Sequence, residues 1–392
     1  MSTGATNAAF DEVVRLLRFD TTSRDSNLAI VEYVTEKLRG VGVEPTLVPN
    51  EDGTKANLFA TIPAADGTTS GGIVLSGHTD VVPVDGQVWA SDPFDPVVRD
   101  GLLYGRGSCD MKAFIGVILA KLPQLVEARL AEPIHLAFSY DEEVGCLGAV
   151  SLIEAMQVAG LTPRGCIVGE PTSMRVVLGH KSINVFRIDF RGVAAHSSLT
   201  PEGVNAIVHA SEFAVFAQRI ADEFRDNGPF DEHYVVPFTT LSVNQINGGI
   251  AVNTVPAECS LVFEFRSVAA VDQAQLTQRF RTEVQRIDAV MSAQNPEAGA
   301  KLTVVAAAPG VDTPDDADIV SFAAACGAIP SPDKATFGTE AGLFAQAGIP
   351  TVVCGPGDIA QAHAPNEFIA LEQIEQCERF LKGVIDSLST SD

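Results

Sequence analysis

The chain has 392 residues, of which 46% are hydrophobic and 19% charged, with 33 Gly and 22 Pro. This is the composition of a compact globular protein and not of a disordered one, and the length exceeds what one hydrophobic core usually organises, so we expect two domains. Lys and Arg total 26 against 50 Asp and Glu, a formal charge of -24 that disfavours nucleic acid and anionic membranes as partners. A cationic or zwitterionic small substrate fits this charge better.

The seven cysteines are scattered along the chain without a Cys-x-x-Cys pair, which disfavours disulfides and thiolate zinc sites. Residues 1–19 carry Asp11 and Glu12 inside an amphipathic pattern, unlike a signal peptide, which has a basic start and an unbroken apolar stretch. The longest apolar run elsewhere, 113–120, is too short to span a bilayer. We therefore expect a cytoplasmic protein with no membrane partner.

Apolar positions at helical spacing predict two helices within residues 10–38. Short apolar runs then predict buried strands, with helices at 114–130 and 149–159 between them; the runs are 73–75, 134–138, 166–168 and 351–354. This alternation is typical of an α/β sheet.

The middle of the chain predicts a different unit. Its expected elements are a strand at 183–190, a helix at 204–224, strands at 240–246 and 259–266, a helix at 273–291 and a strand at 302–306. The order βαββαβ builds a small ferredoxin-like sheet with helices on one face. We predict a first domain made of residues 1–178 and 309–392, interrupted by a second domain at 179–308.

His, Asp and Glu side chains follow four predicted strands, at the point where each strand ends. They are His78 after 73–75, Asp141, Glu142 and Glu143 after 134–138, Glu170 after 166–168, and His363 after 351–354. Because the carboxyl ends of strands form the ligand-binding crevice of an open α/β sheet, we expect these side chains at one edge. Imidazole and carboxylate bind zinc and similar cations, so the pattern predicts a metal site. Each carboxylate taken alone also fits a solvated loop or a helix cap.

Asp80 stands two residues after His78, on the same side of an extended chain, where its carboxylate can orient the imidazole or cap a turn. The remaining candidates among the histidines, His135, His209 and His233, fall within predicted elements or an irregular stretch, and we predict structural roles for them.

Asp110 stands in the segment 105–112, Gly-Arg-Gly-Ser-Cys-Asp-Met-Lys, whose two glycines let the backbone pass close to a neighbour. The third glycine of a dinucleotide fingerprint is missing, and the chain has no P-loop and no nucleophile elbow. Phosphate binding and serine-hydrolase chemistry are therefore disfavoured. Cys109 fits a small buried residue better than a reactive thiol.

Five segments in order carry a resemblance to a known family. They are 77–80 (Gly-His-Thr-Asp), 105–112, 141–145 (Asp-Glu-Glu-Val-Gly), 169–172 (Gly-Glu-Pro-Thr) and 363–367 (His-Ala-Pro-Asn-Glu). Together they resemble the aminoacylase, acetylornithine deacetylase and succinyl-diaminopimelate desuccinylase family of zinc-dependent amidohydrolases and exopeptidases. The resemblance covers nearly the whole chain. It implies a zinc-exopeptidase-like catalytic domain with a mixed central sheet, interrupted by a lid domain that also forms the contact of a homodimer.

The resemblance also implies two zinc ions per subunit, for which Co²⁺ can substitute. It assigns His78, Asp110 and Glu170 to one zinc, and Asp110, Glu143 and His363 to the other, so that Asp110 is the bridge. Neighbouring residues of an extended segment point in opposite directions, so Glu142 and Glu143 should differ in role, but spacing alone leaves open which one is the ligand.

Two further roles come from the resemblance. Glu142 is implied to be the general base that takes a proton from the attacking water and returns it to the departing amine. His196, in the segment 192–197, matches the family's lid histidine, which reaches into the site of the partner subunit.

Finer features resemble the acetylornithine deacetylase branch of the family, through 105–110, 337–341 (Phe-Gly-Thr-Glu-Ala) and 355–363. Desuccinylases carry a Ser-Asp-Gly-Arg type sequence where this chain has 339–341, which counts against a dicarboxylate acyl group. The expected reaction is hydrolysis of N-acetyl-L-ornithine to L-ornithine and acetate, a step of arginine biosynthesis.

For substrate binding, we hypothesise that Glu340 holds the side-chain ammonium while Arg266 pairs with the α-carboxylate. Glu340 fits the start of a surface helix equally well. Asn253 matches a lid position that contacts substrate in related enzymes, or it caps a turn.

Other functions stay open at this stage. The chain fits an aminoacylase, a desuccinylase or a metal-dependent exopeptidase, all acting on small acylated amino acids or peptides. A catalytically silent relative that keeps the fold as a binding protein is disfavoured, because such proteins usually lose ligands or the base and this chain keeps them all.

Overall fold

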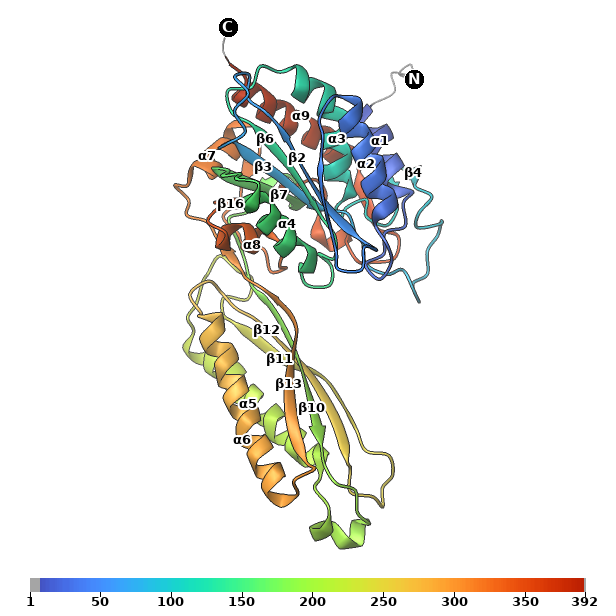
Figure 1. Cartoon of the computed structure of the whole chain (residues 1–392), viewed down its shortest axis with the longest axis vertical. Coiled ribbons are helices and arrows are strands. Elements are labelled where there is room, and N and C mark those ends of the chain that lie inside the picture. Colours follow the sequence, from blue (N-terminus) through green and yellow to red (C-terminus); the bar gives the residue numbers. More distant parts are fainter. Residues whose placement is uncertain (1–7, 391–392) are drawn as a thin grey trace. The chain divides into compact units, whose positions relative to one another are not determined.

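The computed structural model describes residues 8–390 (Figure 1). Contacts between Cα atoms divide the chain into two units: His180–Gly310 with Ala335–Gly338 form the second, and the rest of the chain forms the first. No helix in residues 8–390 combines the length and the apolar character that a bilayer crossing requires.

The first unit is built on a six-stranded mixed sheet with the order β1-β2-β6-β3-β7-β16. Its strands are β1 Thr46–Pro49, β2 Ala56–Ile62, β3 Ile73–His78, β6 Ile134–Ser139, β7 Gly165–Pro171 and β16 Thr351–Gly355. Strands β6, β3, β7 and β16 run parallel and are buried along their whole length, as their continuous apolar runs predict. Their carboxyl ends therefore meet at one edge.

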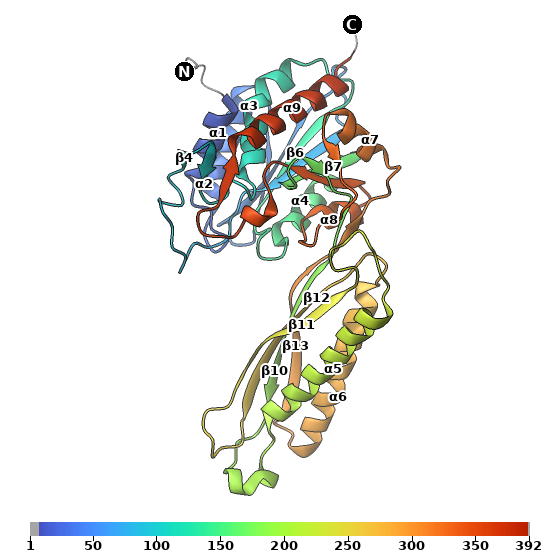
Figure 2. The same ribbon diagram turned by 180° about the vertical axis from the view of Figure 1, so that it is seen from behind.

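Helices cover both faces of this sheet. They are α1 Ala8–Leu17, α2 Leu28–Gly40, α3 Lys112–Glu127, α4 Leu147–Val158, α7 Asp318–Ala325, α8 Ala341–Gln346 and α9 Leu371–Leu388. Figures 1 and 2 show α1, α2, α3 and α9 packed together on one face, with α4 and α8 on the other. The apolar core of the unit lies between these layers.

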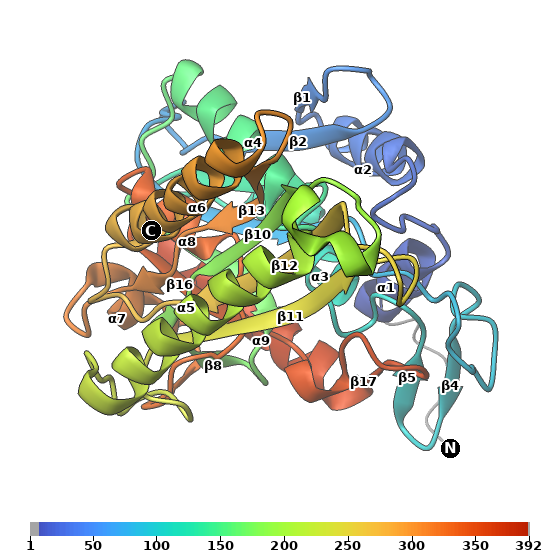
Figure 3. The ribbon, with the colours of Figure 1, turned by 90° about the horizontal axis from the view of Figure 1, so that it is seen from below.

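Short strands complete the first unit. β4 Val97–Arg99, β5 Leu102–Tyr104 and β17 Phe368–Ala370 form a small sheet (Figure 3); β8 Arg175–Val176 pairs with β15 Ile329–Pro330, and β9 Gly179–His180 with β14 Val311–Asp312. Two 3₁₀ helices, η1 Ser197–Glu202 and η2 Ile359–Gln361, lie in the second and first unit respectively. The pairing of Phe368 with Tyr104 brings the segment that ends at Glu367 beside the segment that begins at Gly105.

The second unit is a four-stranded antiparallel sheet with the order β11-β12-β10-β13, and α5 and α6 cover one of its faces (Figure 2). Its elements are β10 Ile183–Arg191, α5 Ala206–Asn227, β11 Thr240–Gly248, β12 Glu258–Arg266, α6 Gln273–Gln294 and β13 Gly299–Ala308. Aromatic rings fill its core; Phe186, Phe213, Phe263 and Phe280 lie with ring centroids 5.0–6.4 Å apart.

The predicted fold class, an α/β unit with a mixed sheet and a βαββαβ ferredoxin-like unit, is confirmed. The roles of residues 179–308 as a lid and as a dimer contact stay predictions. Strands β1 and β2 were not predicted, and β2 carries the polar residue Asn57 next to its first residue. In the structure the Asn57 side chain donates to Gly148 O and Ser151 Oγ and accepts from Tyr140 N, so the strand buries this polar residue at little cost.

Candidate metal centre

The carboxyl ends of the parallel strands bring the predicted ligands together. His78 is the last residue of β3, and Glu170 lies next to the last residue of β7. Glu143 follows the end of β6, and His363 lies in the loop after β16 and η2. Asp110 instead precedes α3, and the Asp110–Met111 peptide bond is cis.

Asp110 faces two groups of ligands with its two oxygens. Oδ1 lies 3.0 Å from Nε2 of His78, and Oδ2 lies 3.2 Å from Nε2 of His363. Glu170 Oε1 lies 3.6 Å from the same nitrogen of His78, and Glu143 Oε2 lies 2.9 Å from that of His363. In each trio the ligand atoms lie within 4.8 Å of one another. We call His78, Asp110 and Glu170 the inner cluster, and Asp110, Glu143 and His363 the outer cluster.

The spacing and chemistry of both clusters suit metal ions. A tetrahedral zinc with ligand bonds of about 2.0–2.1 Å separates its ligand atoms by about 3.3 Å, close to the contacts found here. The buried Oε1 of Glu143 has no hydrogen-bond partner within residues 8–390, an arrangement that is costly unless a cation or water satisfies it. Two imidazoles and three carboxylates therefore fit a pair of divalent cations with Asp110 between them.

The pKa shifts of the candidate ligands also favour bound cations. Burial, with the charge of Asp110, raises the pKa of Glu170 well above its ordinary value and that of Glu143 to about 7. Hydrogen bonds to Asp110 and Glu143 raise the pKa of His363 to about 10. Burial opposes the charged form of His78, but its hydrogen bond to Asp110 raises the pKa of the imidazole well above its ordinary value. Burial likewise opposes the charged form of Asp110, but hydrogen bonds to His363 and His78 lower the pKa of that carboxyl. So many buried carboxylates ionise together only when cations lie among them.

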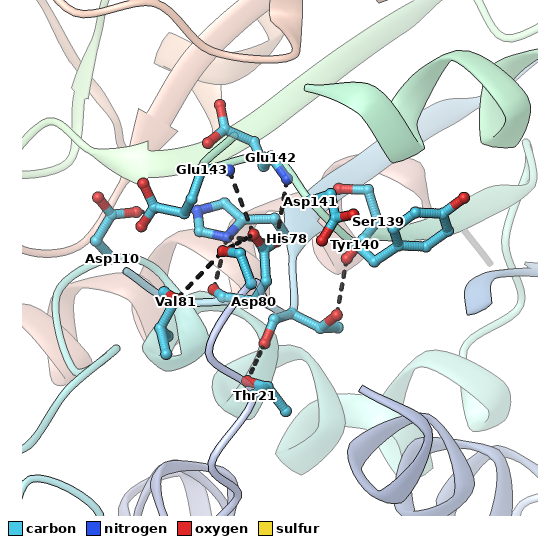
Figure 4. A network of polar contacts seen from close by, with 12 residues as sticks. Thr21, His78, Asp80, Val81, Asp110, Ser139, Tyr140, Asp141, Glu142 and Glu143 are labelled. Atoms are coloured by element: carbon cyan, nitrogen blue, oxygen red, sulfur yellow. Dashed lines mark hydrogen bonds and ion pairs between the residues drawn. The ribbon is translucent and has the colours of Figure 1, made fainter. Parts of the chain in front are cut away.

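Asp80 holds the segment that carries the candidate base. Its carboxylate accepts hydrogen bonds from the backbone N–H groups of Glu142 at 3.1 Å and Glu143 at 3.3 Å (Figure 4). It also accepts one from the Ser23 hydroxyl at 2.7 Å. Nδ1 of His78 lies 3.5 Å from that carboxylate but 2.9 Å from the main-chain oxygen of Asp80. The backbone of Asp80 therefore makes the closer contact with the imidazole, and its side chain positions the 142–143 backbone, which the sequence analysis did not foresee.

Glu142 and Glu143 lie in a turn and not on an extended segment, because the backbone N–H groups of Gly145 and Cys146 both donate to the Glu142 carbonyl. The premise of alternation along an extended chain is therefore wrong, but the two side chains still have different surroundings. Glu143 joins the outer cluster, whereas Glu142 belongs to neither trio of candidate ligands. Glu142 is 8% exposed, and its Oε1 lies 3.3 Å from the thiol of Cys146, which donates to it. Burial raises the pKa of Glu142 well above its ordinary value; His78 opposes this rise, and the charges of Glu143 and Asp110 add to it.

Glu340 lies at the start of α8, but in the interior of the first unit. It is 0% exposed, and its two oxygens accept hydrogen bonds from the hydroxyls of Ser76 on β3, at 2.7 Å, and Ser139 on β6, at 2.6 Å. The alternative interpretation as a surface helix start is wrong. Contact of Glu340 with a substrate ammonium stays a hypothesis, and the observed contacts favour a role in joining the two strands beneath the clusters.

Three predicted residues lie in the second unit. His196 caps η1, and its Nδ1 lies 2.8 Å from the Ser198 hydroxyl. Asn253 is its neighbour, because the Asn253 carbonyl accepts from Ser197 N and Thr254 forms a β-bridge with His196. Arg266 ends β12 and lies 3.5 Å from Glu264.

Other buried polar groups near the clusters were missed. Lys112, fully buried, donates to Phe19 O at 2.7 Å, and burial lowers its pKa to about 7. Glu367 ends the motif 363–367, and it is 1% exposed and accepts a hydrogen bond from the Asp110 backbone N–H. Nothing in their local sequence distinguishes them from surface charges. Cys109 is buried as predicted; its thiol lies 3.2 Å from Asp358 O.

An α/β unit with imidazole and carboxylate clusters at the carboxyl ends of its strands is the architecture of a metallohydrolase. The chain belongs to Peptidase family M20/M25/M40, whose model matches residues 74–387. This family comprises metal-dependent hydrolases, so the predicted family and the predicted class of enzyme are confirmed.

Two relatives span almost the whole chain. An acetylornithine deacetylase of Myxococcus xanthus is 33% identical over 378 residues, which are 95% of each chain. An acetylornithine deacetylase of Pasteurella multocida is 31% identical over 374 residues, 93% of this chain and 92% of the relative.

Solved structures share the fold. A metallo-carboxypeptidase of the M20 family from Sulfolobus solfataricus aligns with a TM-score of 0.75 and 17% identity, over 97% of this chain and 99% of that one. A dinuclear metal-binding M20 peptidase from Bacillus subtilis aligns with a TM-score of 0.64 and 14% identity, over 97% and 99%.

Proposed function

We propose that the chain hydrolyses N-acetyl-L-ornithine to L-ornithine and acetate, using two zinc ions held by the inner and outer clusters. The observation that supports this most strongly is the placement of Asp110, whose two oxygens face His78 and His363 on opposite sides. The substrate follows from the acetylornithine deacetylases that are 31–33% identical over nearly the full chain. The dinuclear M20 relative supports the second metal.

In this proposal the residues around the clusters each have a task. Bound metal ions supply Lewis-acid polarisation of the acyl carbonyl and of the attacking water. Glu142 takes the proton from that water and hands it to the departing amine. The Cys146 thiol donates a hydrogen bond to Oε1 of Glu142. In this proposal Oε2 is therefore the oxygen that carries the proton. Asp80 keeps the backbone of Glu142 in place through its contacts with the 142–143 segment.

The general base is tested by Glu142→Gln, with metal content and deacetylation measured on the same sample. We expect the metal content to stay at the wild-type value and kcat to fall by about a hundred- to ten-thousandfold. Glu154→Gln, on the exposed side of α4, is the matched control and should keep full activity. A metal-loaded Glu142→Gln protein as active as the control would overturn the mechanism.

A substrate panel separates the related activities. N-acetylornithine, an uncharged N-acetyl amino acid, N-succinyl-diaminopimelate and a dipeptide represent the deacetylase, the aminoacylase, the desuccinylase and the exopeptidase. We expect the highest kcat/KM with N-acetylornithine. A higher kcat/KM with another substrate of the panel would overturn the proposed substrate and favour the activity that this substrate represents.

Glu340→Gln on two substrates tests the substrate contact. Because Glu340 is buried against two hydroxyls, we expect equal losses on N-acetylornithine and on the uncharged acetyl amino acid. A loss confined to N-acetylornithine would instead support the hypothesis that Glu340 holds the ammonium.

We further propose a homodimer formed through the second unit, in which His196 of one subunit completes the site of the other and Arg266 and Asn253 bind substrate. Mixing the inactive variants Glu142→Gln and His196→Ala tests this directly. Random exchange gives mixed dimers with one intact site each, so about a quarter of wild-type activity should return. If the mixture stays inactive although subunits exchange, His196 acts within its own subunit; a His196→Ala variant that is active by itself would show that His196 has no role in the reaction.

We also propose a cytoplasmic location. All seven cysteines are buried and unpaired, which fits a reducing compartment. Fractionation of cells with an antibody against the chain checks this location.

A further inference from the structure

The segment that carries Asp110 is held by one buried carboxylate. Oε1 of Glu367 accepts hydrogen bonds from the backbone N–H of Cys109 at 2.8 Å and of Asp110 at 3.1 Å. Oε2 accepts from the backbone N–H of Gly107 at 3.1 Å and from Arg106 Nη1 at 2.6 Å. Hydrogen bonds to an ionised acceptor are stronger than neutral ones, and four of them converge here on one side chain. Glu367 thus fixes the backbone from 107 to 110.

The same network reaches the backbone of His363. Arg106 Nη2 donates to Gln87 Oε1 at 2.8 Å, and Gln87 Nε2 donates to the His363 carbonyl at 2.9 Å. Trp89 also donates to Gln87 Oε1, at 3.0 Å, and the Arg106 guanidinium lies 5.2 Å from its ring centroid. A continuous chain of contacts therefore runs from the Asp110 backbone through Glu367, Arg106 and Gln87 to the His363 backbone.

Two further contacts tighten the loop that carries His363. Asn366 Oδ1 accepts from Ala90 N at 2.8 Å, and Gly105 N donates to the carbonyl of Glu367 at 3.0 Å. His363 and Asn366 both have left-handed φ, of 60° and 59°, a conformation that is uncommon for non-glycine residues, although His and Asn adopt it more readily than most. The His363 loop therefore depends on these contacts for its shape.

The burial of this network makes it costly unless each group is paired. Arg106 and Glu367 are each 1% exposed, so neither charge is solvated by bulk water. Removing one partner of such a pair leaves the other buried and uncompensated. Neither residue belongs to the inner or outer cluster, so metal ligation does not explain their burial.

We propose that Glu367 is a positioning residue that, through Arg106 and Gln87, locks the Asp110 and His363 backbones together and thereby preforms the outer cluster. This inference rests on the metal site proposed above. It adds that the spacing between the Asp110 and His363 ligands is set by a polar network outside the clusters.

Glu367→Gln tests the first link. The amide keeps the size of the side chain but turns two acceptor positions into a donor group that faces N–H donors. We expect the affinity for the second equivalent of Zn²⁺, measured by calorimetry, to fall by about ten- to a hundredfold, which is usual when a partner behind metal ligands is lost. The visible absorption of the Co²⁺-loaded protein should change as well, because it reports coordination geometry. Glu375→Gln, exposed on α9, is the matched control.

Gln87→Ala tests the far end of the network with less risk to folding, because Gln87 is only partly buried. It releases the His363 carbonyl but leaves Glu367 on the Asp110 backbone. We expect weaker binding of the second Zn²⁺ with the first equivalent unchanged, whereas Glu367→Gln also weakens the first because Asp110 is shared. Hydrogen exchange of the metal-free protein should rise in residues 361–367 for Gln87→Ala, and in 105–111 as well for Glu367→Gln.

The outcomes separate this inference from the proposed function. If the wild-type chain binds fewer than two metal ions, the proposed metal site fails and this inference falls with it. If the wild type binds two and both variants match the Glu375→Gln control in affinity, absorption and exchange, only this inference is overturned. If Glu367→Gln does not fold, the result with Gln87→Ala decides.

Discussion

The inner and outer clusters share Asp110 but differ in what supports their remaining ligands. His78 and Glu170 come from β3 and β7, neighbouring strands of the central sheet, and their side chains are at most 4% exposed. Glu143 comes from the turn after β6, and His363 from a loop in which its side chain is 54% exposed. The inner ligands are therefore fixed by the sheet itself, whereas the outer ligands depend on loop contacts, and we expect the outer metal to be the weaker one.

Asp110→Asn should have the largest effect because Asp110 serves both clusters. We expect both metals to be lost on dialysis and kcat to fall by at least about a thousandfold, since Lewis-acid stabilisation is worth several kcal/mol. Metal analysis and assay of the same sample check this. If the variant keeps two metal ions, Asp110 does not bridge them.

His78→Ala and His363→Ala compare the clusters directly. We expect His363→Ala to retain one equivalent of zinc after dialysis, because the inner trio is untouched. His78→Ala should retain less, because the ligands that remain lie on loops. If both variants retain the same amount of zinc, the inner cluster does not bind metal more tightly than the outer cluster.

Asp80→Asn probes the support of Glu142 and Glu143 without removing a candidate ligand. An amide in place of the carboxylate can accept only one of the two backbone N–H bonds that Asp80 accepts. We expect activity to fall by about ten- to a hundredfold while the inner zinc stays bound. A variant with wild-type kcat would show that these bonds are dispensable.

The smallest expected effect is a pH dependence of metal-linked stability. Glu143 has a folded pKa of about 7, raised above its ordinary value, so the folded metal-free chain binds more protons than the unfolded one between pH ~4.5 and 7. Its contribution to stability is therefore lost as pH rises through that window, whereas a bound cation favours the ionised form. The gap in Tm between metal-loaded and metal-free protein should widen by a few degrees from pH 5 to 7. Scans with and without chelator measure it, and a constant gap would contradict it.

The sequence predicted the inner cluster better than the outer one, for a physical reason. Strand ends in a parallel sheet converge, so His78 and Glu170 could be placed from their apolar runs alone. Asp110 follows no strand of the central sheet, and only its motif connected it with the others. Spacing left open which of Glu142 and Glu143 is the ligand, and the resemblance alone grouped Glu143 with His363. The structure has both glutamates in a turn, with Glu143 facing His363.

The polar supports could not be predicted because their partners lie far away in sequence. Glu367 and Asp110 are 257 residues apart, and Gln87 and His363 are 276 apart. Strand β2 was not predicted, and its buried Asn57 depends on groups about 90 residues away. Local patterns show which residue types are present, whereas the burial of a charge is decided by the tertiary packing.

The thiol of Cys109 sits between the two loops that the outer cluster needs. It is buried against Asp358 O, and a side-chain carbon at Gly357, whose φ is +90°, would lie only 2.6 Å from its sulfur. Because Cys109 is only 1% exposed, an alkylating reagent reaches its sulfur only when the surrounding structure opens. The rate of Cys109 alkylation, measured by mass spectrometry, therefore reports how often the structure around the candidate metal centre opens. This measurement needs no substrate.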